Sequence, residues 1–107
     1  MAEVVWTEPA LADLDAIADY VALENPAAAS ALVSRVYTHV GRLIEHPGSG
    51  SRPLELGKAT RYRQIVAPPC RVFYRFDGAR VVVLYVMRGE RLLRPLQLTK
   101  RAKGAET

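Results

Sequence analysis

Arginine is the residue type that gives this 107-residue sequence most of its capacity for chemistry. A guanidinium group holds five N–H donors in a planar fork that fits a carboxylate or a phosphate. Such groups gather between residues 61 and 94, in and around an apolar run. We therefore predict that an anionic target or partner binds at these candidate residues: Arg61, Arg63, Arg71, Arg75, Arg80, Arg88, Arg91 and Arg94.

Catalysis by these arginines would need a proton acceptor nearby. Cleaving RNA through its 2′-OH requires a base, a phosphate clamp and a donor to the leaving oxygen. Arginine can clamp phosphate, but its pKa is too high for base work at neutral pH. The two histidines, His39 and His46, are expected on a helix away from the strands, and neither has Cys or His partners at metal-ligand spacing. The residues thus predict no catalytic set, no metal site and no cofactor.

The net charge of +4 hides a strong asymmetry along the chain. Residues 1–57 hold three basic groups against eight acidic ones, whereas residues 58–103 hold twelve basic groups against two acidic ones. A basic half of this kind favours an anionic partner, which can be nucleic acid, a ribonucleoprotein or an acidic protein segment.

Length and composition predict a small cytoplasmic domain. Half of the residues are apolar, which suits one modest core. The sequence lacks a run of about eighteen apolar residues, so we expect no membrane span. Its first residues lack the basic-then-apolar pattern of a signal peptide. The single cysteine, Cys70, cannot form an internal disulfide, which favours a reduced compartment.

Residues 70–88 predict a β-hairpin that organises the rest of the chain. Asp77-Gly78 favours a two-residue turn, which places Phe76 opposite Ala79. Alternation then assigns the following side chains to a core face: Cys70, Val72, Tyr74, Phe76, Val81, Val83, Tyr85 and Met87. We expect the function to lie on the other face, which carries Arg71, Phe73, Arg75, Arg80, Val82, Leu84, Val86 and Arg88.

Helices and further strands are expected on both sides of the hairpin. Thr7 and Asn25 are good N-caps, and each precedes a segment with apolar residues at helical spacing. We expect a strand at residues 3–7, helices ending near residues 24 and 45, a strand at 60–66 and an extended segment at 90–96. The predicted fold class is α+β, in the order β-α-α-β-β-β, with an N-terminal helical hairpin packed on one face of a small antiparallel sheet. It forms a single domain over residues 1–96, followed by a basic, flexible tail over 97–107.

Short segments along residues 3–94 together carry a resemblance to a known family. They are Val5-Trp6-Thr7, Ala16-Ile17-Ala18-Asp19-Tyr20, Asn25-Pro26-Ala27-Ala28-Ala29, Leu43-Ile44-Glu45-His46-Pro47, Tyr62-Arg63-Gln64-Ile65, Arg71-Val72-Phe73-Tyr74-Arg75 and Val86-Met87-Arg88-Gly89-Glu90-Arg91. In this order and spacing, the chain resembles the RelE/ParE toxins of bacterial type II toxin–antitoxin modules. The resemblance implies the fold of that family.

The resemblance implies two alternative activities. RelE-like members are ribosome-dependent endoribonucleases that use basic residues and often a C-terminal Tyr. ParE-like members share the fold, lack much of that set and are associated with inhibition of DNA gyrase. Arg71 and Arg91 match arginines of the RelE-like set. Tyr62 and Gln64 stand where that set has lysines, Arg88 stands where some related nucleases have a His, and no Tyr follows Arg91. These departures favour the ParE-like branch.

The resemblance also implies a cognate antitoxin. We expect an acidic, partly disordered segment that folds on binding, over the arginine face or along the helical hairpin, and forms a hetero-oligomeric complex. DNA gyrase is the expected target. The ribosome is the alternative target, and Arg71, Arg88 and Arg91 would then be catalytic. A third hypothesis is a binding module with the toxin fold and no toxicity.

Overall fold

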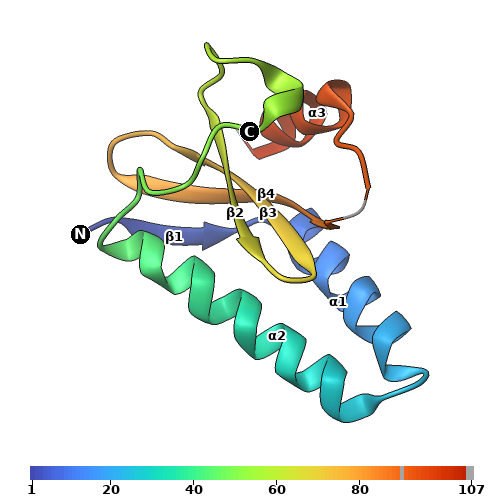
Figure 1. Cartoon of the computed structure of the whole chain (residues 1–107). Helices are drawn as coiled ribbons and strands as arrows, with labels where there is room; N and C mark the ends of the chain where they lie inside the picture. Colours follow the sequence, from blue (N-terminus) through green and yellow to red (C-terminus); the bar gives the residue numbers. More distant parts are fainter. Residues whose placement is uncertain (90, 106–107) are drawn as a thin grey trace.

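The computed structural model describes residues 1–89 and 91–105, which form a sheet with helices on both faces (Figure 1). Its elements in chain order are β1 (Glu3–Trp6), α1 (Glu8–Ala22), α2 (Pro26–Gly41), the short 3₁₀ helices η1 (Arg42–Ile44) and η2 (Leu54–Leu56), β2 (Tyr62–Ala67), β3 (Cys70–Phe76), β4 (Arg80–Arg88) and α3 (Pro95–Ala105). The α+β class and the order β-α-α-β-β-β are confirmed, and α3 adds a helix at the C-terminal end.

The sheet is mixed rather than antiparallel. Its strand order is β1-β4-β3-β2, and β2, β3 and β4 pair antiparallel to one another. β1, however, runs parallel to β4, with Val4 beside Val81 and Trp6 beside Val83. The expectation of an antiparallel sheet was wrong for this strand because side-chain alternation identifies a strand and its buried face but carries no information on its direction.

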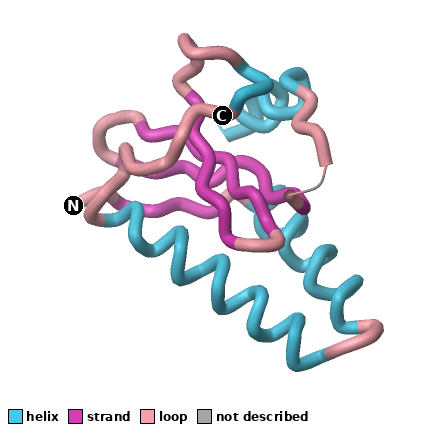
Figure 2. Tube along the Cα trace, viewed as in Figure 1, coloured by secondary structure: helices cyan, strands magenta, loops and turns pink. Residues whose placement is uncertain are grey.

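Both predicted helix starts are confirmed. The Thr7 hydroxyl accepts a hydrogen bond from the Ala10 N–H at 3.4 Å, and the Asn25 side chain accepts one from the Ala28 N–H at 3.1 Å. The Thr7 hydroxyl also donates to the Val83 carbonyl at 2.8 Å, which ties the start of α1 to β4. In Figure 2 the two long helices form a hairpin along one side of the sheet.

The hairpin register differs from the two-residue turn that Asp77-Gly78 favours. Phe76 pairs with Val81, and four residues lie between them. The Asp77 carboxylate accepts hydrogen bonds from the Ala79 and Arg80 N–H groups at 3.1 and 2.8 Å, so the aspartate side chain closes a longer loop. These hydrogen bonds also lower the pKa of Asp77.

A β-bulge then reverses the alternation in the second half of β4. Tyr74 pairs with Val83, but its neighbour Phe73 pairs with Tyr85, which leaves Leu84 as an extra residue. Val86 therefore faces the α1–α2 side. Tyr85 and Met87, expected on that face, instead lie on the opposite one.

Two apolar clusters pack on the two faces of the sheet. The larger, under α1 and α2, consists of Ala10, Leu14, Leu32, Val36, Val40, Leu43, Ala67, Cys70, Val72, Tyr74, Val81, Val83 and Val86. The smaller, under α3, consists of Phe73, Val82, Leu84, Met87, Leu93, Leu98 and Ala102. The face expected to be open and functional is thus covered in its centre by α3.

The expectation of a flexible tail over residues 97–107 was wrong for residues 97–105. They belong to α3, whose Leu98 and Ala102 are buried against the sheet. The spacing of four residues between these two side chains places them on one helix face. Residues 106–107 of the expected tail and Glu90 of the expected extended segment lie outside the described residues. Within residues 1–89 and 91–105, no helix has the length and apolar character needed to cross a membrane.

Candidate functional site

The structure separates the eight candidate arginines instead of presenting them on one face. Arg71, Arg88 and Arg91 come together where β3 begins and β4 ends. Arg80 is exposed at the far end of β4, and Arg75 is buried in the sheet. The other three arginines lie on or before β2 and before α3: Arg61, Arg63 and Arg94.

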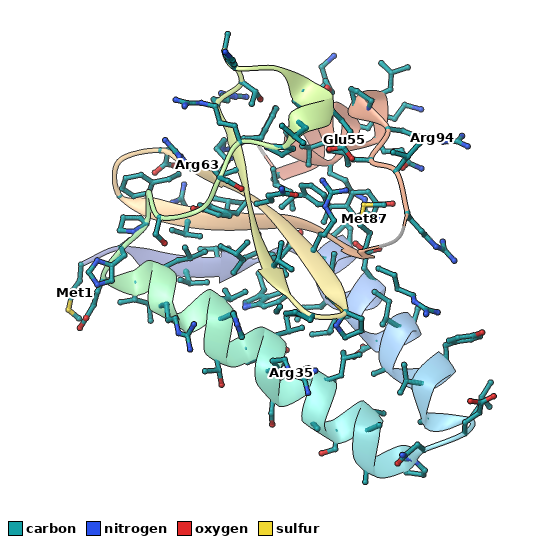
Figure 3. The ribbon with its side chains drawn as sticks, in the orientation of Figure 1. Met1, Arg35, Glu55, Arg63, Met87 and Arg94 are labelled. Atoms are coloured by element: carbon teal, nitrogen blue, oxygen red, sulfur yellow. The ribbon has the colours of Figure 1, made fainter. Side chains whose placement is uncertain are left out.

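The arginines on and before β2 are engaged with local groups. Arg63 donates to the Gly50 carbonyl at 2.8 Å. The Arg61 guanidinium lies 5.3 Å from the centre of the Tyr62 ring and donates to its hydroxyl at 3.4 Å. In Figure 3, Arg63 lies far from Arg94, which projects from the chain just before α3.

Arg71 is held in a network of interactions. Its guanidinium forms a bidentate ion pair with Glu55, in which both N···O distances are 2.9 Å, and its Nε donates to Gln64 at 2.8 Å. It also stacks over the Phe73 ring at 4.9 Å. Arg71 therefore already binds a carboxylate of its own chain.

Glu55 joins this network to the segment after β4. Its Oε2 accepts from the Leu93 N–H at 3.1 Å, and Arg71 donates to the Arg91 carbonyl at 3.4 Å. The hydrogen bonds from Arg71 are the main cause that lowers the pKa of Glu55 from 4.5 to about 2. At neutral pH the pair is fully charged, and it ties η2 to residues 91–93.

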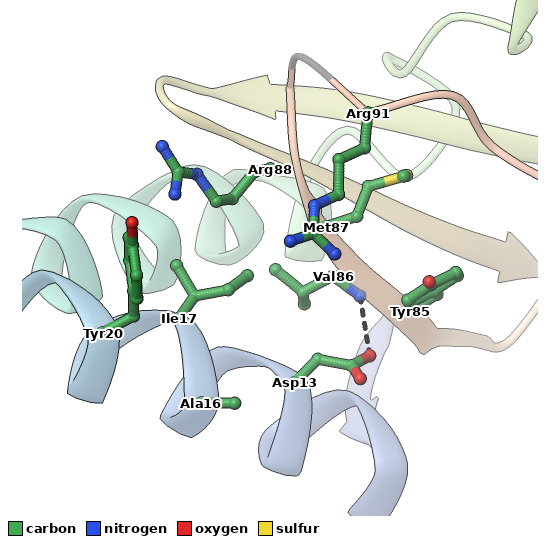
Figure 4. Close-up of a pocket in the computed structure, with 9 residues that line it drawn as sticks. All are labelled: Asp13, Ala16, Ile17, Tyr20, Tyr85, Val86, Met87, Arg88 and Arg91. Atoms are coloured by element: carbon green, nitrogen blue, oxygen red, sulfur yellow. Dashed lines mark hydrogen bonds between the residues drawn. The ribbon is translucent and has the colours of Figure 1, made fainter.

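A pocket of about 380 Å³ lies beside this network, between α1 and the end of β4 (Figure 4). Its lining residues are Asp13, Ala16, Ile17, Tyr20, Tyr85, Val86, Met87, Arg88 and Arg91. Arg88 and Arg91 project over it, and the Arg88 guanidinium lies 5.3 Å from the centre of the Tyr20 ring. The pocket therefore combines an apolar floor with a basic rim.

The pocket forms because β4 extends beyond β1. The last β1–β4 pair is Trp6 with Val83, after which the chain turns into α1. On the β1 side, the Val86 N–H therefore has no neighbouring strand to bond to. It donates instead to the Asp13 carboxylate at 3.1 Å. Side chains of α1 form the opposite wall.

Asp13 also anchors α3. It forms a bidentate ion pair with Arg101, with N···O distances of 2.8 and 3.0 Å. Arg101 donates further to the Leu84 carbonyl at 3.0 Å and lies 4.6 Å from the centre of the Tyr85 ring. The hydrogen bonds to Asp13 raise the pKa of Arg101. Asp13 is therefore a structural acid, already engaged by a guanidinium and a backbone N–H.

No histidine lines this pocket, and its two tyrosines are engaged, because the Tyr20 ring faces Arg88 and the Tyr85 hydroxyl donates to the Gln97 side chain at 3.3 Å. His39 and His46 are absent from its lining. The Tyr74 hydroxyl accepts from the Gly50 N–H at 3.0 Å and donates to the Pro47 carbonyl at 2.8 Å, and burial raises its pKa. Within the described part of the chain, no group of three or more metal-ligating residues could hold a metal ion.

Reasoning from the sequence did not identify Glu55 and Asp13 as the partners of Arg71 and Arg101. Glu55 stands between Leu54 and Leu56, in the stretch that separates the expected helix end near residue 45 from the expected strand at 60–66. Leu56 packs against the cluster under α3 but Leu54 is exposed, so the two leucines do not by themselves indicate that Glu55 is engaged. For the pairing of Asp13 with Arg101, 88 residues apart, the sequence carries no local signal.

Comparisons with known proteins agree with this architecture. The family described as the ParE toxin of the type II toxin–antitoxin system parDE matches residues 4–93. A curated relative, Toxin RelE2 of Caulobacter vibrioides, is 37% identical over 92 residues, which cover 86% of this chain and 100% of the relative. A solved structure described as the chromosomal ParDE TA system from P. aeruginosa has a TM-score of 0.67 and 32% identity, and the match covers 84% of this chain and 98% of that one. The chain therefore belongs to the RelE/ParE family of toxins of type II toxin–antitoxin systems.

Proposed function

We propose that this chain is a ParE-like toxin that acts by binding, inhibits DNA gyrase and is neutralised by a cognate antitoxin. The observation that carries this choice is the state of Arg71, whose guanidinium is occupied by Glu55 at 2.9 Å. A phosphate clamp needs a guanidinium with donors to spare, and 2′-OH attack needs a base. Arg71 has no such donors to spare, and no histidine lines the pocket beside it, whereas the apolar floor and arginine rim of that pocket suit a protein segment.

The antitoxin is proposed to occupy the pocket between α1 and β4. An acidic segment that is partly disordered until bound would place apolar side chains against Ile17 and the exposed Tyr20 ring. Its carboxylates would meet Arg88 and Arg91 at the rim. The result is a hetero-oligomeric complex. Because gyrase and translating ribosomes are cytoplasmic, the proposal assigns the toxin to the cytoplasm under either activity.

A RelE-like endoribonuclease is the second candidate, and the name of the relative Toxin RelE2 favours it. In that case Arg71, Arg88 and Arg91 would contact mRNA on the ribosome. This activity requires Arg71 to exchange Glu55 for a phosphate, and it requires a base from outside the set described above.

Two assays run side by side decide between these candidates. Purified protein is added to gyrase with relaxed plasmid, and separately to ribosomes programmed with mRNA. Loss of supercoiling with intact mRNA supports the ParE-like function. Cleaved mRNA with normal supercoiling supports the RelE-like alternative. If induction of the chain in cells causes no growth arrest and both assays are negative, the chain is a binding module without toxicity.

A further inference from the structure

Three leucines near α3 are exposed although neighbouring leucines are packed. Leu54, Leu92 and Leu96 are 94%, 82% and 75% exposed. Their neighbours Leu93 and Leu98 are buried in the cluster under α3. The buried leucines therefore hold these segments against the sheet. The exposed leucines of the same segments point to solvent. We call Leu54, Leu92 and Leu96 the leucine patch.

The Arg71–Glu55 pair holds the two segments of the leucine patch together. Leu54 precedes Glu55, whose carboxylate accepts from the Leu93 N–H at 3.1 Å. Leu92 lies between Leu93 and Arg91, whose carbonyl accepts from Arg71. The side chains of the pair are only 13% and 20% exposed, so the tie lies beneath the surface. Leu96 follows in the first turn of α3. The ion pair thus positions the patch.

The surroundings of the leucine patch are basic. Arg91 and Arg94 are exposed on the same segment as Leu92, and Figure 3 shows Arg94 beside α3 on the same side as Glu55. Arg71 neutralises Glu55, so that carboxylate adds no net negative charge. Exposed apolar patches rimmed by polar residues mark protein–protein interaction sites, and arginine is enriched at such interfaces. Nucleic-acid interfaces are more polar, so three exposed leucines favour a protein.

We propose that the leucine patch is the surface through which this toxin docks on its protein target, an inference that rests on the proposed function of a toxin acting by binding. Charge complementarity defines the fitting surface as apolar side chains beside carboxylates. Arg91 lines the antitoxin pocket and also adjoins Leu92. An antitoxin segment that binds Arg91 therefore competes with the target at the edge of the patch. Neutralisation follows from this overlap.

The test changes the patch without touching the pocket or the core. Leu92→Glu with Leu96→Glu introduces two carboxylates where the target is expected to present its own. The matched control is Leu23→Glu, because Leu23 is 83% exposed in the turn between α1 and α2, at the opposite end of the molecule in Figure 1. The readouts are growth arrest on induction, the protein concentration that halves gyrase supercoiling, and the thermal unfolding midpoint.

We expect the patch variant to lose growth arrest and to need at least about tenfold more protein for half-inhibition, because its new carboxylates would face those of the target. Its unfolding midpoint and that of Leu23→Glu should match the wild type, and Leu23→Glu should stay toxic. A folded patch variant that arrests growth as strongly as the wild type overturns the inference. Arrest that depends on the patch while supercoiling is untouched keeps the docking surface and refutes gyrase as the target. A wild-type chain that cleaves ribosome-bound mRNA, or arrests nothing, overturns both proposals.

Discussion

The ion pair between Glu55 and Arg71 predicts a stability difference that depends on pH in a defined way. The pKa of Glu55 is lowered from 4.5 to about 2, chiefly by its hydrogen bonds from Arg71 and further by the backbone N–H groups of Glu55 and Leu93. That gap corresponds to about 3 kcal/mol of preference for the charged carboxylate in the folded state. Because the Glu55 side chain keeps 20% of its surface exposed, solvent screening reduces this, and we expect Glu55→Gln to cost about 2 kcal/mol at neutral pH.

The direction in which this stability contribution changes with pH follows from the lowered pKa of Glu55. A carboxyl whose pKa is lowered by folding stabilises the fold fully above its unfolded value of 4.5, and that contribution is lost as pH falls toward about 2. The difference between wild type and Glu55→Gln should therefore be constant from neutral pH to about pH 6. At about pH 3 it should shrink to less than half.

Urea denaturation of both proteins across this pH range measures the difference directly. Glu24→Gln is the control, because Glu24 is exposed in the turn after α1 and has no ion pair within the described residues. Its stability difference from wild type should stay close to zero at every pH. A Glu55→Gln difference that is absent at neutral pH, or unchanged at about pH 3, would refute the argument that this pair ties η2 to the segment after β4.

Three further variants test other contacts. Arg101→Met should cost about 1–2 kcal/mol in denaturant because Asp13 loses its partner, whereas the exposed Lys103→Met should cost little. Gly50→Ala should lower the free energy of unfolding by about 2 kcal/mol or more, since an added Cβ would lie 2.5 Å from the Tyr74 hydroxyl oxygen. Gly48→Ala, with open space around it, serves as its control. Arg88→Glu with Arg91→Glu should weaken antitoxin binding by at least about tenfold in calorimetry, with Arg80→Glu as the matched control; equal affinity would place the antitoxin elsewhere.

Local signals in the sequence were sufficient for most of the secondary structure. Thr7 and Asn25 cap their helices through their own side chains, and each such contact spans three residues. Contacts between residues so close in the chain depend only on the local sequence, which is why they could be predicted. The helix ends were less accurate: α1 stops at Ala22 and α2 at Gly41, before η1 carries the chain to Ile44. The 3₁₀ turn prolongs the helical pattern without continuing the α-helix.

The register of the β-hairpin depended on choices that the sequence pattern does not encode. Asp77-Gly78 suits a two-residue turn with Phe76 opposite Ala79, but Phe76 pairs with Val81, and the Asp77 carboxylate binds two N–H groups of the connection. The second register shift, at Leu84, cannot be predicted from the residue type, because a bulge of this kind accepts an ordinary apolar side chain. The assignment of Tyr85, Val86 and Met87 to faces failed for that reason.

α3 was missed because its composition is that of a solvated helix. Pro95–Ala105 buries only Leu98 and Ala102 and carries several basic side chains. What holds it is partly the long-range ion pair of Arg101 with Asp13, a contact that no window of sequence contains. Residues that look like a charged tail therefore become part of the second apolar cluster.

The charge asymmetry of the chain acquires a different meaning once these pairs are known. The acidic first half supplies Glu55 and Asp13, and the basic second half supplies their partners Arg71 and Arg101. Part of the positive charge that the sequence offers to an outside partner is thus used inside the fold, to close η2 and α3 over the sheet. Arg91 and Arg94 stay exposed, next to the pocket on one side and the leucine patch on the other. Recognition by this toxin is therefore expected along the rim of α3 and the end of β4, where charge and apolar surface coincide, and not on the face of the sheet.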